Sequence, residues 1–182
     1  MNYNSVAEIY EDIDSKRASL LRGVEGLSDE QQAFRASPGK WSVAEIVEHL
    51  LLVERSVARL LGSLLGKAEG AGQARDDAVP FAHVSIAGFV EQSRTQKYSA
   101  PESARPAGIP LAESLARLRE SRAAVEALRP RFESVDGAAT LFPHPAFGPL
   151  NLYQWLAFLG AHDARHLAQI NALKETMNTA SE

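Results

Sequence analysis

Two helix start signals, each followed by a long apolar stripe, constrain the fold of this chain more than any other feature. The segments SVAE and NLYQ, which begin at Ser42 and Asn151, are capping boxes in which two side chains satisfy backbone N–H groups at the helix start. Behind each box, apolar residues recur with the 3.6-residue period of one helix face. The pattern predicts helices from Ser42 to near Gly66 and from Asn151 to about Met177.

The same periodicity predicts two further long helices, over residues 5–24 and 110–129. The second of them begins with a proline, which is favoured in a first helical turn because its missing N–H would have no partner there. Pro130 discourages continuation of that helix. A short helical turn is expected after Ser28, where Ser-Asp-Glu has the composition of a cap and first turn.

The connection between the second and third long helices is the longest in the chain and has a mixed character. Residues 69–77 form a Gly/Ala-rich linker, residues 81–94 could form a further helix, and residues 98–110 are expected to be extended or irregular. A long connection allows two consecutive helices to run parallel. The chain is therefore predicted to be an all-α, up-down-down-up four-helix bundle with a long crossover between helices two and three. No strand alternation is visible, and residues 1–182 are expected to form one domain.

Composition excludes several kinds of site and compartment. The chain has no cysteine, so disulfides, thiolate ligands and a cysteine nucleophile are ruled out, and any metal site must use His, Asp or Glu. A formal net charge of −4 and the lack of a basic cluster argue against nucleic-acid binding. The acidic N-terminal segment lacks the apolar core of a signal peptide, and prolines interrupt the long uncharged stretch 137–162. A cytoplasmic protein without a membrane span is expected.

His162 and His166 lie one helical turn apart in the run HDARH, inside the apolar stripe of the last predicted helix. Residues i and i+4 differ by about 40° around a helix axis, so the two rings share one face. A buried imidazole without a hydrogen bond or a metal costs roughly 1–3 kcal/mol, and a divalent cation bound by both rings would remove that cost. His49, on the flank of the second long helix, is the candidate third ligand. Three neutral imidazoles with one position left for a water or a thiolate are typical of a catalytic zinc site, and they also suit nickel or iron.

The same spacing is compatible with a bundle that binds no metal. Glu54 and Asp163 lie near the two stripes and could accept hydrogen bonds from the histidine rings. They could do so in place of a metal, or as outer partners that orient metal ligands, and the spacing does not separate these interpretations. Arg165 lies off the stripe, which is more typical of a solvated or interface residue than of a substrate anchor.

The other histidines and the tryptophans have simpler interpretations. His144 lies in the segment FPHPAFGPLN, where proline and glycine indicate a tight loop before the last helix. Shaping that loop is the expected role of His144, and forming the rim of a pocket is the alternative. His83 is interpreted as exposed. Trp41 and Trp155 hold staple positions beside the two capping boxes and are expected to be core residues.

Two blocks of the sequence, PGKWSVAEIVEHLLLVE and HPAFGPLNLYQWLAFLGAHDARHLAQI, resemble the DinB-like superfamily, also known as the DinB/YfiT-like metalloenzymes. The first block is similar to the family's tryptophan-led second helix, which ends in a ligand histidine. The second is similar to its fourth helix, in which an H-x-x-x-H pair is followed by Gln-Ile. The resemblance implies an up-down-down-up bundle, often dimeric, that holds a divalent metal, zinc or nickel or else iron, on His49, His162 and His166.

The resemblance implies less about the reaction. Some relatives are thiol-dependent transferases or isomerases that activate a low-molecular-weight thiol on the metal, and others are described only as hydrolases or as damage-inducible proteins. The leading expectation is a metal-dependent enzyme, of the thiol S-transferase type or a hydrolase, that acts on a small molecule. The alternative is a non-catalytic metal-binding or stress-response module. A homodimer is the expected assembly, with neither nucleic acid nor membrane as a partner.

Overall fold

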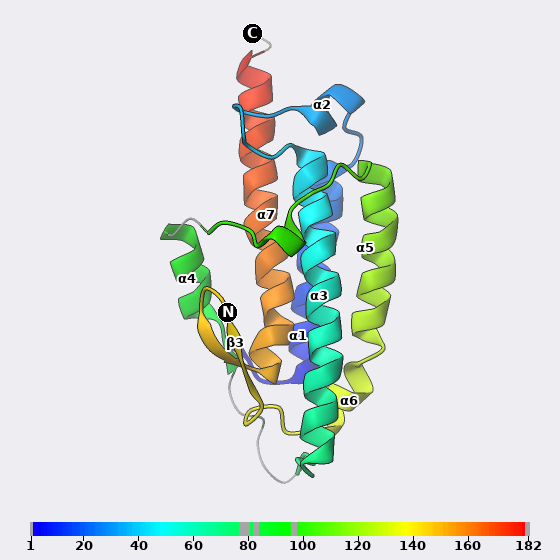
Figure 1. Ribbon diagram of the computed structural model, residues 1–182, viewed down its shortest axis with the longest axis vertical. Coiled ribbons are helices and arrows are strands. Elements are labelled where there is room, and N and C mark those ends of the chain that lie inside the picture. The colour runs from blue at the N-terminus through cyan, green and yellow to red at the C-terminus, as the bar shows by residue number, and fades with distance from the viewer. Residues whose placement is uncertain (1, 77–80, 82–83, 96–97, 181–182) are drawn as a thin grey trace.

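Long helices dominate the computed structural model, which describes residues 2–76, 81, 84–95 and 98–180. The long helices are α1 (Val6–Val24), α3 (Val43–Gly70), α5 (Leu111–Glu126) and α7 (Leu152–Ala180). Figure 1 shows α1 running upward, α3 and α5 both running downward, and α7 running upward to the C-terminal end. The up-down-down-up order and the long crossover between α3 and α5 are therefore confirmed. None of the helices described is long and apolar enough to cross a membrane.

Both predicted capping boxes are formed. At the start of α3, the Ser42 backbone N–H donates to Glu45 Oε2 at 2.8 Å, and the Glu45 N–H donates to Ser42 Oγ at 3.3 Å. At the start of α7, the Asn151 N–H donates to Gln154 Oε1 at 3.0 Å, and the Gln154 N–H donates to Asn151 Oδ1 at 2.8 Å. These bonds satisfy N–H groups that a helix start leaves without intrahelical partners, and they fix where each helix begins.

Two helix ends differ from the prediction. α3 continues beyond the expected end at Gly66, because Leu64, Leu65 and Ala68 are buried and their packing outweighs the roughly 1 kcal/mol that a glycine costs in a helix interior. α5 ends before the expected residue 129, and a new helix α6 (Arg129–Ser134) carries the proline in its first turn. A proline in the first turn begins a helix as readily as it ends the preceding one.

The remaining short elements lie before α1 or between the long helices. The turn after Ser28 is helix α2 (Asp29–Ala33), as predicted. The crossover contains strand β2 (Val84–Ser85), helix α4 (Ala87–Thr95) and the 3₁₀ helix η1 (Glu102–Ala104). Strand β1 (Asn2–Tyr3) pairs antiparallel with β2, so the start of the chain is tied to the crossover. α4 accounts for the further helix expected over residues 81–94, although it begins later.

A β-hairpin precedes α7, where the sequence indicated only a loop. Strand β3 (Leu141–His144) pairs antiparallel with β4 (Gly148–Asn151), and the two prolines of these strands face each other in the register. A two-stranded ribbon has only edge strands, so prolines are tolerated in both. Strands of four residues are also too short for apolar alternation to reveal them, which is why no strand alternation is visible in the sequence.

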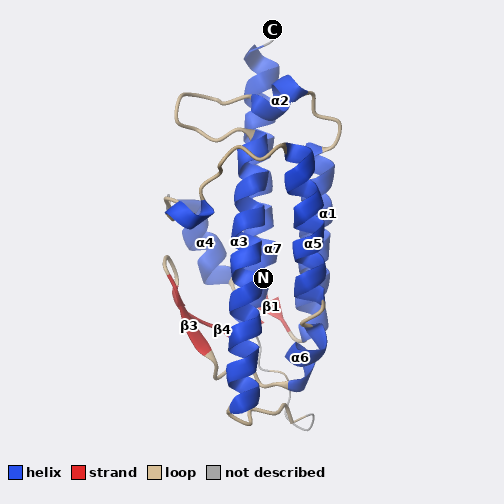
Figure 2. Ribbon diagram, turned by 45° about the vertical axis from the view of Figure 1, so that its right-hand side comes forward, coloured by secondary structure: helices blue, strands red, loops and turns tan. Residues whose placement is uncertain are grey.

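The apolar core is divided into two parts by a layer of polar side chains. α7 packs against α1 and α3, and α3 packs also against α5, so α3 and α7 lie side by side, as Figures 1 and 2 show. One apolar cluster contains Ile13 of α1 and Leu61 of α3, and the other contains Leu20 and Leu50 of the same two helices. Buried polar residues occupy the level between the clusters: Arg17, His49, Glu54, Asp163 and His166.

Candidate metal centre

Three histidine side chains from two helices converge in the polar layer. α3 contributes His49 and α7 contributes His162 and His166, and one ring nitrogen of each lies within 4.8 Å of those of the other two. His49 and His166 are 6% and 5% exposed, whereas His162 is partly exposed. The structure thus brings together all three histidines that the sequence singled out. Within the residues that the structure describes, no carboxylate is part of this group.

The hydrogen bonds of two of the rings determine which nitrogen faces the cluster. His49 Nδ1 donates to the Ala104 carbonyl oxygen at 2.7 Å, and a carbonyl oxygen can only accept. His166 Nδ1 donates in the same way to Gln169 Oε1 at 2.7 Å. A neutral imidazole that donates through Nδ1 keeps a lone pair on Nε2. The Nε2 atoms of His162 and His166 are 3.1 Å apart, so in the metal-free protein His162 Nε2–H donates to the lone pair on His166 Nε2.

The three rings fit a divalent cation. Two nitrogens that each lie about 2.0–2.1 Å from a tetrahedral zinc ion are about 3.3 Å from each other. The 3.1 Å separation in the pair on α7 matches this spacing, and the 4.8 Å limit for the whole set requires only a small movement of the ring on α3. Carbonyl and amide oxygens are the outer partners that metal-bound histidines usually have, and two of these three rings already have one.

Aromatic rings cover the sides of the cluster. The Trp41 ring lies 4.8 Å from the His49 ring, and Phe158 stacks on His162 with the centroids 5.1 Å apart. Trp41 therefore packs on a histidine of the cluster, a contact that its staple position did not predict. Apolar rings on either side restrict water around the imidazoles, and this keeps the imidazoles neutral.

Burial keeps the histidines of the cluster uncharged. Desolvation is the main cause that lowers the pKa of His166 to about 3, and proximity to His49 adds to it. The pKa of His162 is lowered well below its usual value by burial and then by the neighbouring His166. Burial also lowers the pKa of His49, although its hydrogen bond to Ala104 acts in the opposite direction. Neutral imidazoles are the form that binds metals, so a cation can bind these rings without first displacing protons from charged imidazolium groups.

We expect the metal-free protein to lose stability as the pH falls from about 7.5 to about 5.5. In the unfolded chain, histidines take up protons near pH 6.5, whereas in the folded chain these rings stay neutral to lower pH. The unfolded state therefore binds more protons below pH 6.5, and each such histidine costs up to about 1.4 kcal/mol per pH unit. Asp163, whose pKa burial raises to about 6, acts in the opposite direction only below about pH 6, where its folded form takes up a proton before the unfolded form does.

Urea unfolding in the presence of a chelator checks this pH dependence, with the free energy of unfolding measured at several pH values. Replacing His166 with asparagine should reduce the slope of stability against pH, because one depressed histidine is removed. Equal or greater stability at the lower pH would contradict the assignment of neutral, buried rings.

The sequence left open whether Glu54 and Asp163 serve as hydrogen-bond partners of the histidine rings, and the structure pairs them elsewhere. Both carboxylates bind Arg17 of α1: its Nε donates to Asp163 Oδ2 at 2.7 Å and its Nη2 donates to Glu54 Oε2. Asp163 is about 100° around α7 from His162, and Glu54 is about 140° around α3 from His49. Each carboxylate therefore points toward α1 rather than toward the cluster.

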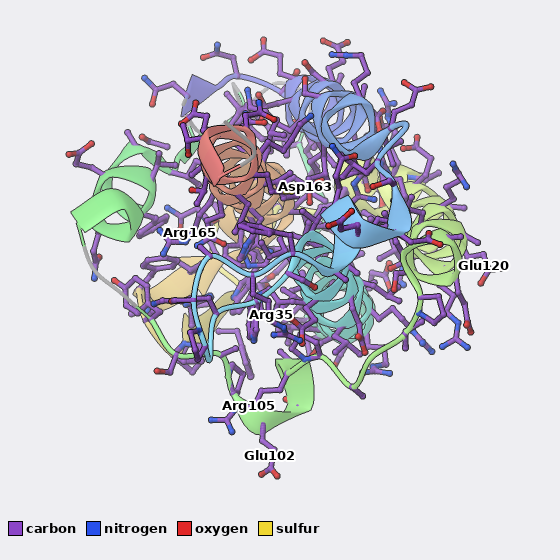
Figure 3. All side chains as sticks on the ribbon, turned by 90° about the horizontal axis from the view of Figure 1, so that it is seen from above. Arg35, Glu102, Arg105, Glu120, Asp163 and Arg165 are labelled. Carbon is purple, nitrogen blue, oxygen red and sulfur yellow. The ribbon has the colours of Figure 1, made fainter. Side chains whose placement is uncertain are left out.

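The other residues weighed from the sequence lie outside the cluster. His144 Nδ1 accepts a hydrogen bond from the Ala146 N–H at 3.1 Å and its ring stacks on Phe147, so His144 shapes the hairpin turn, as predicted. Arg165 is half-buried on the side of α7 opposite Asp163, as Figure 3 shows, and its charge helps to lower the pKa values of the two histidines on its helix. His83 lies outside the described residues.

Sequence reasoning missed three partners in this layer. Arg17 left a signal, because it occupies the one gap in the apolar stripe of α1, between Ile13 and Leu20, and is 7% exposed. Gln169 follows His166 by three residues, a spacing at which helical side chains meet. The Ala104 carbonyl belongs to the backbone of the crossover, so no residue type could have revealed it.

The fold and the site together define a class of protein: an up-down-down-up four-helix bundle with three histidines gathered between two of its helices. The chain belongs to the DinB superfamily, whose family model matches residues 12–170. YuaE, an uncharacterized protein of Bacillus subtilis (strain 168), is 30% identical over 172 residues, which cover 90% of this chain and 96% of that protein.

Two solved structures share the fold. TT2238, a four-helix bundle protein, aligns with a TM-score of 0.61 and 24% identity over 92% of this chain and 99% of its own. YfiT from Bacillus subtilis, a probable metal-dependent hydrolase with an unusual four-helix bundle topology, aligns with a TM-score of 0.60 and 19% identity, over 95% of this chain and 87% of its own. At these identities the likeness establishes the bundle topology.

Proposed function

We propose that this protein is a metal-dependent enzyme that holds one divalent cation on His49, His162 and His166 and acts on a small molecule. The observation that carries the proposal is the convergence of three neutral imidazoles, with no fourth His, Asp or Glu joining them in the described part of the chain. Structural zinc sites are closed by four protein ligands, whereas catalytic sites keep one position open. The likeness to YfiT is consistent with this choice.

The surrounding residues prepare the site for that role. Ala104 and Gln169 fix the tautomers of His49 and His166 and make their Nε2 atoms stronger ligands for a metal. The Phe158 ring restricts water beside His162. A bound divalent cation would supply Lewis acidity, which lowers the pKa of a coordinated water or thiol. Because His162 is partly exposed while His49 and His166 are buried, we expect the open position of the cation on the side of His162.

Two reaction classes fit this arrangement: hydrolysis, and transfer of a group to a low-molecular-weight thiol. The chain has no cysteine, so a thiol reaction needs a cosubstrate that brings the sulfur. Zinc and nickel are the first metals to test by reconstitution, followed by iron, because imidazole ligands suit all three.

Catalysis is tested by comparing the metal-loaded protein, the chelator-treated protein and the His162→Ala variant. The substrates are p-nitrophenyl esters for hydrolysis, and an aromatic electrophile with cysteine, glutathione or 2-mercaptoethanol for thiol transfer. We expect turnover only in the metal-loaded wild type. A protein that binds metal tightly but turns over neither substrate type would favour the non-catalytic metal-binding module.

A cobalt(II) derivative separates the two reaction classes. Cobalt(II) replaces zinc in such sites and reports its ligands by absorption. We expect added 2-mercaptoethanol to produce a thiolate-to-cobalt charge-transfer band if the protein is thiol-dependent. An unchanged spectrum would favour hydrolysis, because the open position would then not accept a thiolate.

A further inference from the structure

Glu48 is a buried carboxylate next to one of the candidate ligands, and the polar layer described above does not account for it. It is 1% exposed on α3, immediately before His49. Its two oxygens accept three backbone N–H groups of the crossover: Ala107 at 2.8 Å on Oε1, and Gly108 and Ile109 both at 2.9 Å on Oε2. A carboxylate with three such donors is well stabilised although it is buried.

The same stretch of crossover also supplies the hydrogen-bond partner of His49. The Ala104 carbonyl oxygen, at the end of η1, accepts from His49 Nδ1 at 2.7 Å. Two consecutive residues of α3 therefore hold both ends of the segment 104–109. Figure 3 shows the side chains of Glu102 and Arg105 pointing away from the bundle, and both residues are exposed. The inward hydrogen bonds of this segment thus come chiefly from its backbone.

We propose that Glu48 is a positioning residue for His49. By holding the backbone of residues 107–109, it keeps the Ala104 carbonyl directed at His49 Nδ1, and this fixes the tautomer whose free Nε2 faces the other two rings. The role of His49 as a metal ligand rests on the proposed function. The control of the His49 tautomer by Glu48 does not depend on a metal. The crossover would then orient a ring of the histidine cluster, in addition to joining two parallel helices.

The test is a Glu48→Gln variant. Glutamine has the same shape, but its NH₂ group faces a backbone N–H donor and cannot accept from it, so at least one of the three bonds is lost. In the metal-free wild type, ¹⁵N NMR of the histidine side chains should show His49 protonated at Nδ1. In the variant we expect a mixture of tautomers and a 10- to 100-fold weaker affinity for zinc, as for other lost outer partners.

Glu45→Gln is the matched control, because Glu45 lies on the same helix three residues earlier and its side chain bonds to Ser42 and Arg35 rather than to the crossover. Glutamine also serves in a capping box, so both readouts should match the wild type. If Glu48→Gln fails to fold, Glu48→Asp keeps the charge on a shorter side chain and should change both readouts in the same direction.

The NMR and zinc measurements test the two proposals independently. A Glu48→Gln variant that folds and keeps His49 in the single Nδ1-protonated tautomer overturns the positioning role, whatever its zinc affinity. A wild type with the expected tautomer but no zinc binding overturns the proposed metal function and leaves the control of the ring by Glu48 standing. If Glu48 only stabilised the fold, Glu48→Gln would change the melting temperature but not the tautomer of His49.

Discussion

Replacing His162 or His49 with alanine is expected to reduce bound metal from about one equivalent to a small fraction of that. Each substitution removes one of three nitrogen donors, and two imidazoles hold a divalent cation far more weakly than three. The loss should exceed the 10- to 100-fold that removal of an outer partner costs. Elemental analysis of purified, tag-free protein after reconstitution with zinc, nickel or iron gives the measurement.

His144→Ala is the control for these variants. Its ring packs on Phe158, with the centroids 5.0 Å apart, and its Nδ1 bonds to the Ala146 N–H rather than to a histidine of the cluster, so the variant should bind metal as the wild type does. Metal should also stabilise the wild type and the control, by about 4 kcal/mol when free metal is a thousandfold above its dissociation constant. A wild type without metal after reconstitution, or metal retained in both cluster variants, would refute the three-histidine site.

Arg17→Met is expected to have the largest effect on stability, a loss of about 3–5 kcal/mol in the free energy of unfolding. Arg17 is the ion-pair partner of both Glu54 and Asp163, and the side chains of these carboxylates are each 3% exposed. Methionine fills much of the space but leaves two buried carboxylates without a cation. For a domain of this size, such a loss corresponds to a fall in melting temperature on the order of 10 °C.

Lys16→Met is the matched control, since Lys16 is the preceding residue of α1 and pairs with Asp12 at the surface. Its effect should stay within about 0.5 kcal/mol. Combining Arg17→Met with Glu54→Gln and Asp163→Asn should recover part of the stability, because the unpaired charges are removed. Equal stability of Arg17→Met and the wild type would show that the ion pairs contribute nothing beyond packing.

The helices and the histidine cluster could be predicted because local rules govern them. The capping boxes at Ser42 and Asn151 depend on neighbouring residues, and the same holds for the i,i+4 pair on α7, which follows from helix geometry alone. His49 was correctly predicted to approach the two histidines of α7, because the flank of an apolar stripe faces the next helix of a bundle.

What escaped prediction depends on contacts between segments far apart in the chain. Glu54 and Asp163 were possible partners of the histidines, and the choice between a ring and Arg17 depends on how α1 is rotated in the bundle, which a periodic pattern does not specify. The Ala104 carbonyl and the bonds of Glu48 likewise require the path of the crossover. Sequence periodicity predicted the convergence of the three histidines, and tertiary packing decided the pairings of the polar residues around them.

The division of the cluster between α3 and α7 has a consequence for how the protein is made. His49 leaves the ribosome long before the pair on α7, because chains are synthesised from the N-terminus and α7 follows all the other elements described. Until α7 has emerged and packed, His49 is a single imidazole with no partner rings and cannot retain a cation. Metal loading would therefore be a late event in biosynthesis, and a metallated molecule is one whose bundle has already closed.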